Sequence, residues 1–193
     1  MEYRDEKIAE LKRERRRLKY TDITGEGVFI SDVFVTFGPR EILGAARLYI
    51  PDTFIEMPKE VQRMKFPSVS RPQVILTSLD SSVNFAFSLV DIRTPDSQIG
   101  TLTLQMKETL KTANPAAVFY IEESELLDSG RPLCMFDFKN FGVDGPMYNM
   151  TCFTPLGPQT LHGTFICPEQ DAGEWKYMAW AAFKTIRAMK QKE

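Results

Sequence analysis

The side chains best suited to nucleophilic chemistry are three cysteines and a single histidine. Cys134, Cys152 and Cys167 all lie in apolar, strand-like runs, and His162 lies in the run QTLHGTFIC. A cysteine nucleophile needs an electropositive, partly exposed setting and a nearby base. These surroundings instead predict buried free thiols and a structural histidine. A cysteine-dependent hydrolase therefore ranks last among three functional hypotheses.

The remaining chemistry-bearing side chains form no recognisable catalytic pattern. One histidine and three dispersed cysteines do not supply four nitrogen or sulfur ligands at zinc-binding spacing. The sequence has no G-x-S-x-G, G-x-x-x-x-G-K-[ST] or G-x-G-x-x-G motif. Its densest acidic run, IEESELLD at 121–128, is typical of a solvated strand end. The sequence thus predicts no catalytic residue, no metal and no cofactor.

Four residues are candidates for contacts with a partner. Lys65 and Arg71 flank the connection FPSVSR and could meet an acidic surface. Met147 and Met150 lie in the run PMYNMTCFT, where flexible thioethers could line an apolar groove. Methionines in such runs are more often core residues, so both interpretations stay open.

Length and composition indicate one soluble globular domain. The chain has 193 residues, of which 43% are hydrophobic and 26% charged. Its net charge of -2 argues against a general nucleic-acid-binding protein. Three cysteines without a CxxC pair fit a reducing compartment, and we find neither a secretory signal nor an apolar run of about 18 residues. We therefore expect a cytoplasmic protein that does not insert into a membrane.

The elements that must position these residues begin with a charged segment. Residues 1–20 predict a helix with eight Lys and Arg against five Asp and Glu, and residues 21–45 form a short β-rich lead-in. A strand is expected at 46–51 and a short helix between Pro58 and Pro67, with Val61 and Met64 as its apolar pair. Two further runs, 73–78 and 83–89, predict a hairpin.

The second half predicts a helix, a meander and a closing helix. Thr94 and Pro95 open a helix that ends before Pro115, and a second amphipathic helix is expected over 169–190. Between them, four β-rich runs (117–124, 132–141, 146–154 and 159–167) are joined by short turns and must pair antiparallel. Their apolar side chains fall on both faces, which favours a sheet covered on both sides or one with an open apolar groove. The fold class is α+β, with a mainly antiparallel sheet of six or more strands.

The stretch LYIPDTFIEMPKEVQRMKFPSVSRPQVILTSLDSSVNFAFSL resembles the N-terminal half of the Mog/PsbP-like superfamily, in its DcrB-like bacterial branch. The order of the later elements agrees, so the resemblance covers about 47–190. It implies a three-layer α/β/α sandwich, as a single PsbP-like domain over 46–193. Members of this superfamily mostly act by binding, as a GTPase accessory factor, a photosystem subunit or secretion-adaptor chaperones. The resemblance lends no catalytic residues to this chain.

Three functional hypotheses follow. The first is a non-enzymatic cytoplasmic protein-interaction module, of the accessory or adaptor-chaperone kind, with a protein partner or a second copy of the chain. The alternative is a small-molecule or lipid-binding protein with a pocket between sheet and helix. The third is the cysteine-dependent hydrolase.

Overall fold

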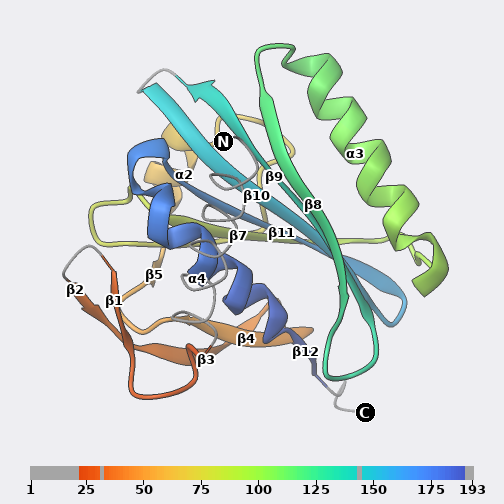
Figure 1. Ribbon diagram of the computed structural model, residues 1–193, viewed down its shortest axis with the longest axis horizontal. Coiled ribbons are helices and arrows are strands. Elements are labelled where there is room, and N and C mark those ends of the chain that lie inside the picture. Colours follow the sequence, from red (N-terminus) through yellow and green to blue (C-terminus); the bar gives the residue numbers. More distant parts are fainter. Residues whose placement is uncertain (1–21, 31–32, 143–144, 190–193) are drawn as a thin grey trace, which may run out of the picture.

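The computed structural model describes residues 22–30, 33–142 and 145–189. Its centre is a seven-stranded sheet with the order β5-β6-β7-β11-β10-β9-β8, in which every pair is antiparallel (Figure 1). The strands are β5 (Ile55–Glu56), β6 (Val74–Thr77), β7 (Asn84–Val90), β8 (Val118–Leu126), β9 (Pro132–Gly142), β10 (Gly145–Leu156) and β11 (Gln159–Pro168). The predicted hairpin and four-strand meander are both confirmed. The helix predicted for residues 1–20 lies outside the described residues.

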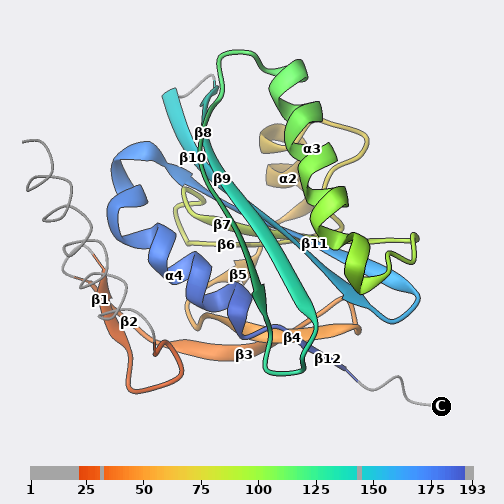
Figure 2. The same cartoon turned by 45° about the vertical axis from the view of Figure 1, so that its right-hand side comes forward.

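Helices cover both faces of this sheet (Figures 1 and 2). On one face, α3 (Ile99–Ala113), preceded by the 3₁₀ turn η1 (Asp96–Gln98), packs over Phe136, Phe138 and Phe153. On the same face, α2 (Lys59–Lys65) packs over Ile75 and Ala86. On the other face, α4 (Ala172–Lys184), preceded by η2 (Glu169–Asp171), covers the largest core cluster. The alternating apolar side chains of the strands require this double cover, and the predicted three-layer fold is confirmed.

A second, three-stranded sheet lies beside α4. Its order is β12-β4-β3, formed by β3 (Phe37–Ile42), β4 (Ala46–Pro51) and β12 (Arg187–Ala188). A separate hairpin joins β1 (Val28–Ile30) to β2 (Val33–Val35). Ile23, Ile30, Phe37 and Ile42 are buried in the same core as α4, so the β-rich lead-in shares its core with the main sheet.

The closing helix is shorter than predicted. It ends at Lys184, and the prediction of a helix to residue 190 is wrong for 185–189. The Thr185 hydroxyl donates to the Ala182 carbonyl and accepts the Tyr49 amide, and Arg187 and Ala188 then pair with β4. Pairing with the edge of β4 satisfies backbone groups of this segment, and Ile186 is buried in the core.

Two local predictions also fail. Thr94 does not cap a helix; its hydroxyl accepts a hydrogen bond from Thr160 on β11, and the turn begins after Pro95. Met64 does not pack beside Val61, because its side chain is 81% exposed, and Phe66 joins Val61 instead. Both positions have the expected local sequence pattern, but contacts with distant residues determine their conformation.

None of the helices in the described part of the chain is long and apolar enough to cross a membrane.

Candidate functional site

A cavity of about 830 Å³ lies between the edge of the main sheet and α4. Strands β8, β9 and β10 form one wall, while η2 and α4 form the other. Most of its lining side chains are aromatic, acidic or small: Phe119, Tyr120, Ile121, Glu123, Asp137, Tyr148, Met150, Glu169, Gln170, Ala172, Gly173, Lys176, Tyr177 and Trp180. This volume lies within the range of ligand-binding cavities, about 300–1,000 Å³.

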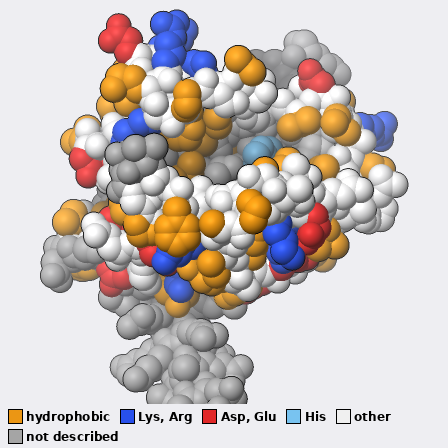
Figure 3. Space-filling model, turned by 90° about the horizontal axis from the view of Figure 1, so that it is seen from above, with side chains coloured by type: hydrophobic (Ala, Val, Ile, Leu, Met, Phe, Trp, Pro, Cys, Tyr) orange, Lys and Arg blue, Asp and Glu red, His pale blue; other side chains and the backbone are white. Residues whose placement is uncertain are grey.

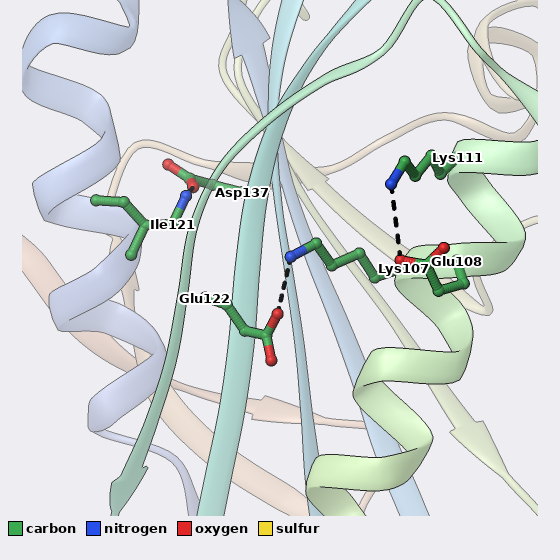
Figure 4. Close-up of polar contacts among 6 residues, drawn as sticks. All are labelled: Lys107, Glu108, Lys111, Ile121, Glu122 and Asp137. Carbon is green, nitrogen blue, oxygen red and sulfur yellow. Dashed lines mark hydrogen bonds and ion pairs between the residues drawn. The ribbon is translucent and has the colours of Figure 1, made fainter.

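A β-bulge in β8 shapes the sheet wall of the cavity. Phe119 pairs with Phe138 and Glu122 pairs with Phe136, so two residues of β8, Tyr120 and Ile121, lie opposite the single residue Asp137. Both residues of the bulge line the cavity. After the bulge, the side chains of β8 again alternate between the two faces of the sheet. Glu122 points to the α3 face, where its carboxylate lies 2.8 Å from the ammonium of Lys107 (Figure 4).

Asp137 occupies the floor of this region and is only 8% exposed. Its Oδ1 accepts the Ile121 amide at 2.7 Å, which is the backbone group that the bulge removes from the regular ladder (Figure 4). Its Oδ2 accepts the Tyr148 hydroxyl at 2.8 Å. Burial raises the pKa of Asp137 above its ordinary value of 3.8, while these two donors and the charge of Lys176 oppose the rise.

Tyr148 lies on β10, beneath α4, and is almost fully buried. Burial, followed by the neighbouring charge of Asp137, raises the pKa of its hydroxyl. The hydroxyl therefore stays protonated and acts as a donor to the carboxylate. Tyr148 and Asp137 form a fixed polar group in the sheet wall of the cavity.

Glu169, on η2, supplies a second carboxylate at the helix wall. The Tyr120 hydroxyl donates to its Oε1 at 3.1 Å, which links the bulge of β8 to η2 across the cavity. Its Oε2 is buried and accepts no hydrogen bond from the residues that the structure describes. A desolvated carboxylate oxygen without a donor costs free energy, so this atom is the unsatisfied acceptor of the cavity.

The helix wall adds one cation and two aromatic rings. The Lys176 ammonium lies 5.2 Å from the centre of the Tyr177 ring, and Trp180 continues the aromatic surface one turn further along α4. Gly173, in the first turn of α4, faces open space, because a Cβ built there would meet no atom within 4 Å. The cavity therefore combines apolar walls with a small number of fixed charges.

The cysteines and the histidine do not meet. Cys152 and Cys167 belong to the α4 face of the sheet, whereas His162 stacks on Phe153 on the α3 face, with 4.6 Å between ring centres. Cys134 shares that face, but Phe153 pairs with both Cys134 and His162 and lies between them. Burial lowers the pKa of His162 to about 4 and raises the pKa of Cys152 and Cys167. The histidine is neutral near neutral pH, and the thiols stay protonated.

The surface near His162 is concave. Seen from above, the molecule is hollowed near the middle of the view, with hydrophobic side chains around the hollow and the histidine visible within it (Figure 3). Within the described ranges, no group of three His, Cys, Asp or Glu side chains could hold a metal ion.

The four residues predicted to contact a partner are not brought together. Met150 lines the cavity, but Met147 lies on the opposite face of the same strand. Lys65 ends α2, on the α3 side of the sheet, and its ammonium donates to the Ser81 carbonyl at 2.5 Å. Arg71 lies in the following loop, where Nε donates to the Ser68 carbonyl at 3.1 Å. Both cationic groups therefore have local structural contacts.

Sequence reasoning missed the residues that form the cavity, among them Tyr120, Ile121, Tyr148 and Glu169. One signal was present: Asp137 shares a strand face with Met135 in PLCMFDFKNF, and a carboxylate on a core-facing position needs fixed donors. The bulge that provides one of those donors leaves no clear mark in the sequence.

Comparison with known proteins supports the fold. No protein-family model matches the sequence, and no curated protein matches it either. Among solved structures, the cyanobacterial PsbP protein CyanoP of Synechocystis sp. PCC 6803 aligns over 79% of this chain and 92% of its own, with a TM-score of 0.59 and 11% identity. LpqN of Mycobacterium tuberculosis, which is involved in cell envelope biogenesis, aligns over 86% and 100%, with a TM-score of 0.52 and 10% identity. At such identities the likeness shows the fold alone: the chain has a PsbP-like fold.

Proposed function

We propose that the protein is a non-enzymatic binding protein that holds a small molecule, or an apolar group of a larger one, in the cavity between the sheet and α4. The observation that carries this proposal is the cavity itself, which several aromatic rings line together with the buried Asp137 and with Glu169, one of whose carboxylate oxygens is buried. Ligand sites commonly pair mostly apolar walls with a few fixed polar groups. The cavity between the sheet and α4 supports the second of the three hypotheses, a small-molecule or lipid-binding protein with a pocket between sheet and helix.

Several features support a binding role over a catalytic one. Phe153 separates Cys134 from His162, and all three thiols are buried, which does not suit a cysteine nucleophile. The carboxylate of Asp137 is occupied by two donors, which suits a structural or orienting role. We extend the proposal to the DcrB-like branch of the Mog/PsbP-like superfamily, on the sequence resemblance, and to a cytoplasmic location, on composition.

The test compares two glycines in equivalent places. Gly173 and Gly100 are each the second residue of a long helix, α4 and α3, and at neither would a Cβ meet an atom within 4 Å. Only Gly173 lines the cavity. Thermal stabilisation is measured for the wild type, Gly173→Leu and Gly100→Leu against a panel of apolar amines, acids and alcohols.

A compound bound in the cavity stabilises the wild type and Gly100→Leu but not Gly173→Leu, because the added side chain fills the space. If every stabilising compound acts equally on all three proteins, the cavity is not the binding site. If no compound in the panel stabilises the wild type, the small-molecule proposal loses its support.

A second candidate, the protein-interaction module, has its own observation. Met64, Val69 and Leu79 are the apolar side chains with the largest exposed fractions among the described residues, at 81%, 97% and 77%. The bond from Lys65 to Ser81 ties the end of α2 to the turn that contains Leu79, so these side chains share one end of the molecule with Lys65 and Arg71. A second copy of the chain is the simplest partner for this surface. Sedimentation analysis of the wild type and Val69→Asp tests it, since a dimer formed here dissociates in the variant.

A further inference from the structure

Among the described side chains that line the cavity between the sheet and α4, acidic groups outnumber basic ones. These are the carboxylates of Glu123, Asp137 and Glu169 and the ammonium of Lys176. A site with this balance and low-dielectric walls attracts cations and repels anions. The charge alone does not define a ligand, and the individual contacts decide which carboxylate is available.

The carboxylates of Asp137 and Glu169 differ in their partners. Asp137 has a donor on each oxygen, and Lys176 is the cation whose charge acts on it. Glu169 has only the Tyr120 hydroxyl on Oε1, and Oε2 accepts nothing from the described part of the chain. No ion pair joins Lys176 to Glu169 within that part. The oxygen in need of a donor is therefore Oε2 of Glu169.

The surroundings of that oxygen suit an organic cation. The rings of Tyr120, Tyr177 and Trp180 line the same cavity, and aromatic faces attract ammonium and guanidinium groups. Met150 and Ile121 give the opposite wall an apolar surface for the rest of a ligand. A hydrated metal ion would find too few oxygen ligands here, because one oxygen of Glu169 and both oxygens of Asp137 already accept hydrogen bonds.

We propose that this cavity selects ligands in which a protonated amine or guanidinium is attached to an apolar or aromatic group, with the cation bound to Oε2 of Glu169 and the apolar part against Met150 and Ile121. This inference rests on the proposed function and adds the chemical class of the ligand. It predicts discrimination by charge among molecules of the same shape.

Calorimetric titration near neutral pH with three matched probes tests it. Phenylbutylamine, phenylbutanol and phenylbutyrate share the same apolar group and differ in the charge of the terminal group. The amine binds about tenfold to a hundredfold more tightly than the alcohol, as expected for one charge-assisted hydrogen bond, and the acid binds most weakly. Glu169→Gln brings the amine to the level of the alcohol without weakening the alcohol.

Glu174→Gln is the matched control, because Glu174 lies in the first turn of α4, directly after the η2 turn that holds Glu169, but does not line the cavity. It leaves the preference for the amine unchanged. If alcohol or acid binds as tightly as the amine, and Gly173→Leu abolishes that binding, the cavity holds ligands but the inferred selectivity for cations is wrong. The same conclusion follows if Glu169→Gln keeps the full preference for the amine. If none of the three probes binds the wild type, both the inference and the proposed function are overturned.

Discussion

The Tyr148 hydroxyl donates a 2.8 Å hydrogen bond to Asp137 between neighbouring strands of the sheet, and both residues are buried beneath α4. The other carboxylate oxygen accepts the Ile121 amide, so β8 and β10 each supply one donor to an acid on β9. A carboxylate held by donors from both neighbouring strands cannot move without disturbing all three. The polar floor of the cavity is therefore pre-organised by the sheet itself.

Tyr148→Phe removes the donor to Oδ2 and leaves a buried carboxylate with one partner. We expect it to lower the free energy of unfolding by about 1–3 kcal/mol. Urea denaturation measures this loss. Tyr120→Phe is the comparison, since Tyr120 is 49% exposed and water replaces its bond to Glu169; its cost is at most about 1 kcal/mol. Equal losses in the two variants would contradict the assigned role of Tyr148.

Asp137→Asn changes how stability depends on pH. Burial raises the pKa of Asp137 in the folded chain above 3.8, so between 3.8 and the raised value the folded state binds more protons than the unfolded state. The wild type therefore loses stability relative to Asp137→Asn as pH rises through that window. Free energies of unfolding of both proteins, measured over a pH series, check the sign. A wild type that gains on the variant with rising pH would show that the hydrogen bonds outweigh burial.

His162 changes the free energy of unfolding with pH in the opposite direction to Asp137, and His162→Gln tests this. The pKa of His162 falls to about 4 in the folded chain from its ordinary 6.5, so between these values the unfolded state binds the additional proton. The wild type loses stability as pH falls from 6.5 towards 4, and His162→Gln lacks this component. The same pH series measures it. A wild-type His162 resonance that titrates near 6.5 in a nuclear magnetic resonance experiment would contradict the burial of the ring.

The three cysteines are expected to react slowly with a thiol reagent in the native protein. All three are buried, and burial raises the pKa of Cys152 and Cys167. Titration with an aromatic disulfide reagent should detect three thiols in denaturant and a much slower reaction without it. A cysteine that reacts in the native protein as fast as free cysteine would reopen the hydrolase hypothesis.

Ile186→Ala tests the segment that follows α4. Ile186 is 1% exposed and packs in the main core between the end of the helix and β12. We expect a loss of about 2–4 kcal/mol in the free energy of unfolding. Ile92→Ala is the matched control, because Ile92 is 58% exposed and its truncation costs less than about 1 kcal/mol. Similar losses for both would contradict the docking of this segment.

Much of the fold follows from periodic patterns in the sequence. The alternation around Phe85 and Phe136 indicates strands with two covered faces, and short turns between consecutive strands impose antiparallel pairing. The parts of the fold that the sequence does not indicate depend on contacts between residues far apart in the chain. Residues 185–189 have a helical pattern, but the free edge of β4 pairs with them.

The cavity was harder to predict than the fold, for a similar reason. Its location needs the bulge at Tyr120 and Ile121, which is a matter of register between β8 and β9 and involves no special residue type. Glu169 follows a strand end and looks solvated in the sequence, yet the return of the chain into α4 buries one of its oxygens. Of the four predicted contact residues, only Met150 lines the cavity.

The bulge has one more consequence, for the behaviour of the protein at high concentration. β8 is the outermost strand of the main sheet, and its outward backbone groups are a template on which a strand of another molecule could add. The additional residue at Tyr120 and Ile121 breaks the spacing of that template, so a strand in register with 122–126 is out of register with 118–119. Glu122 and Glu125 of the same strand are held in ion pairs with Lys107 of α3 and Lys184 of α4. We therefore expect the irregularity that shapes the cavity also to disfavour fibrillar aggregation of the protein.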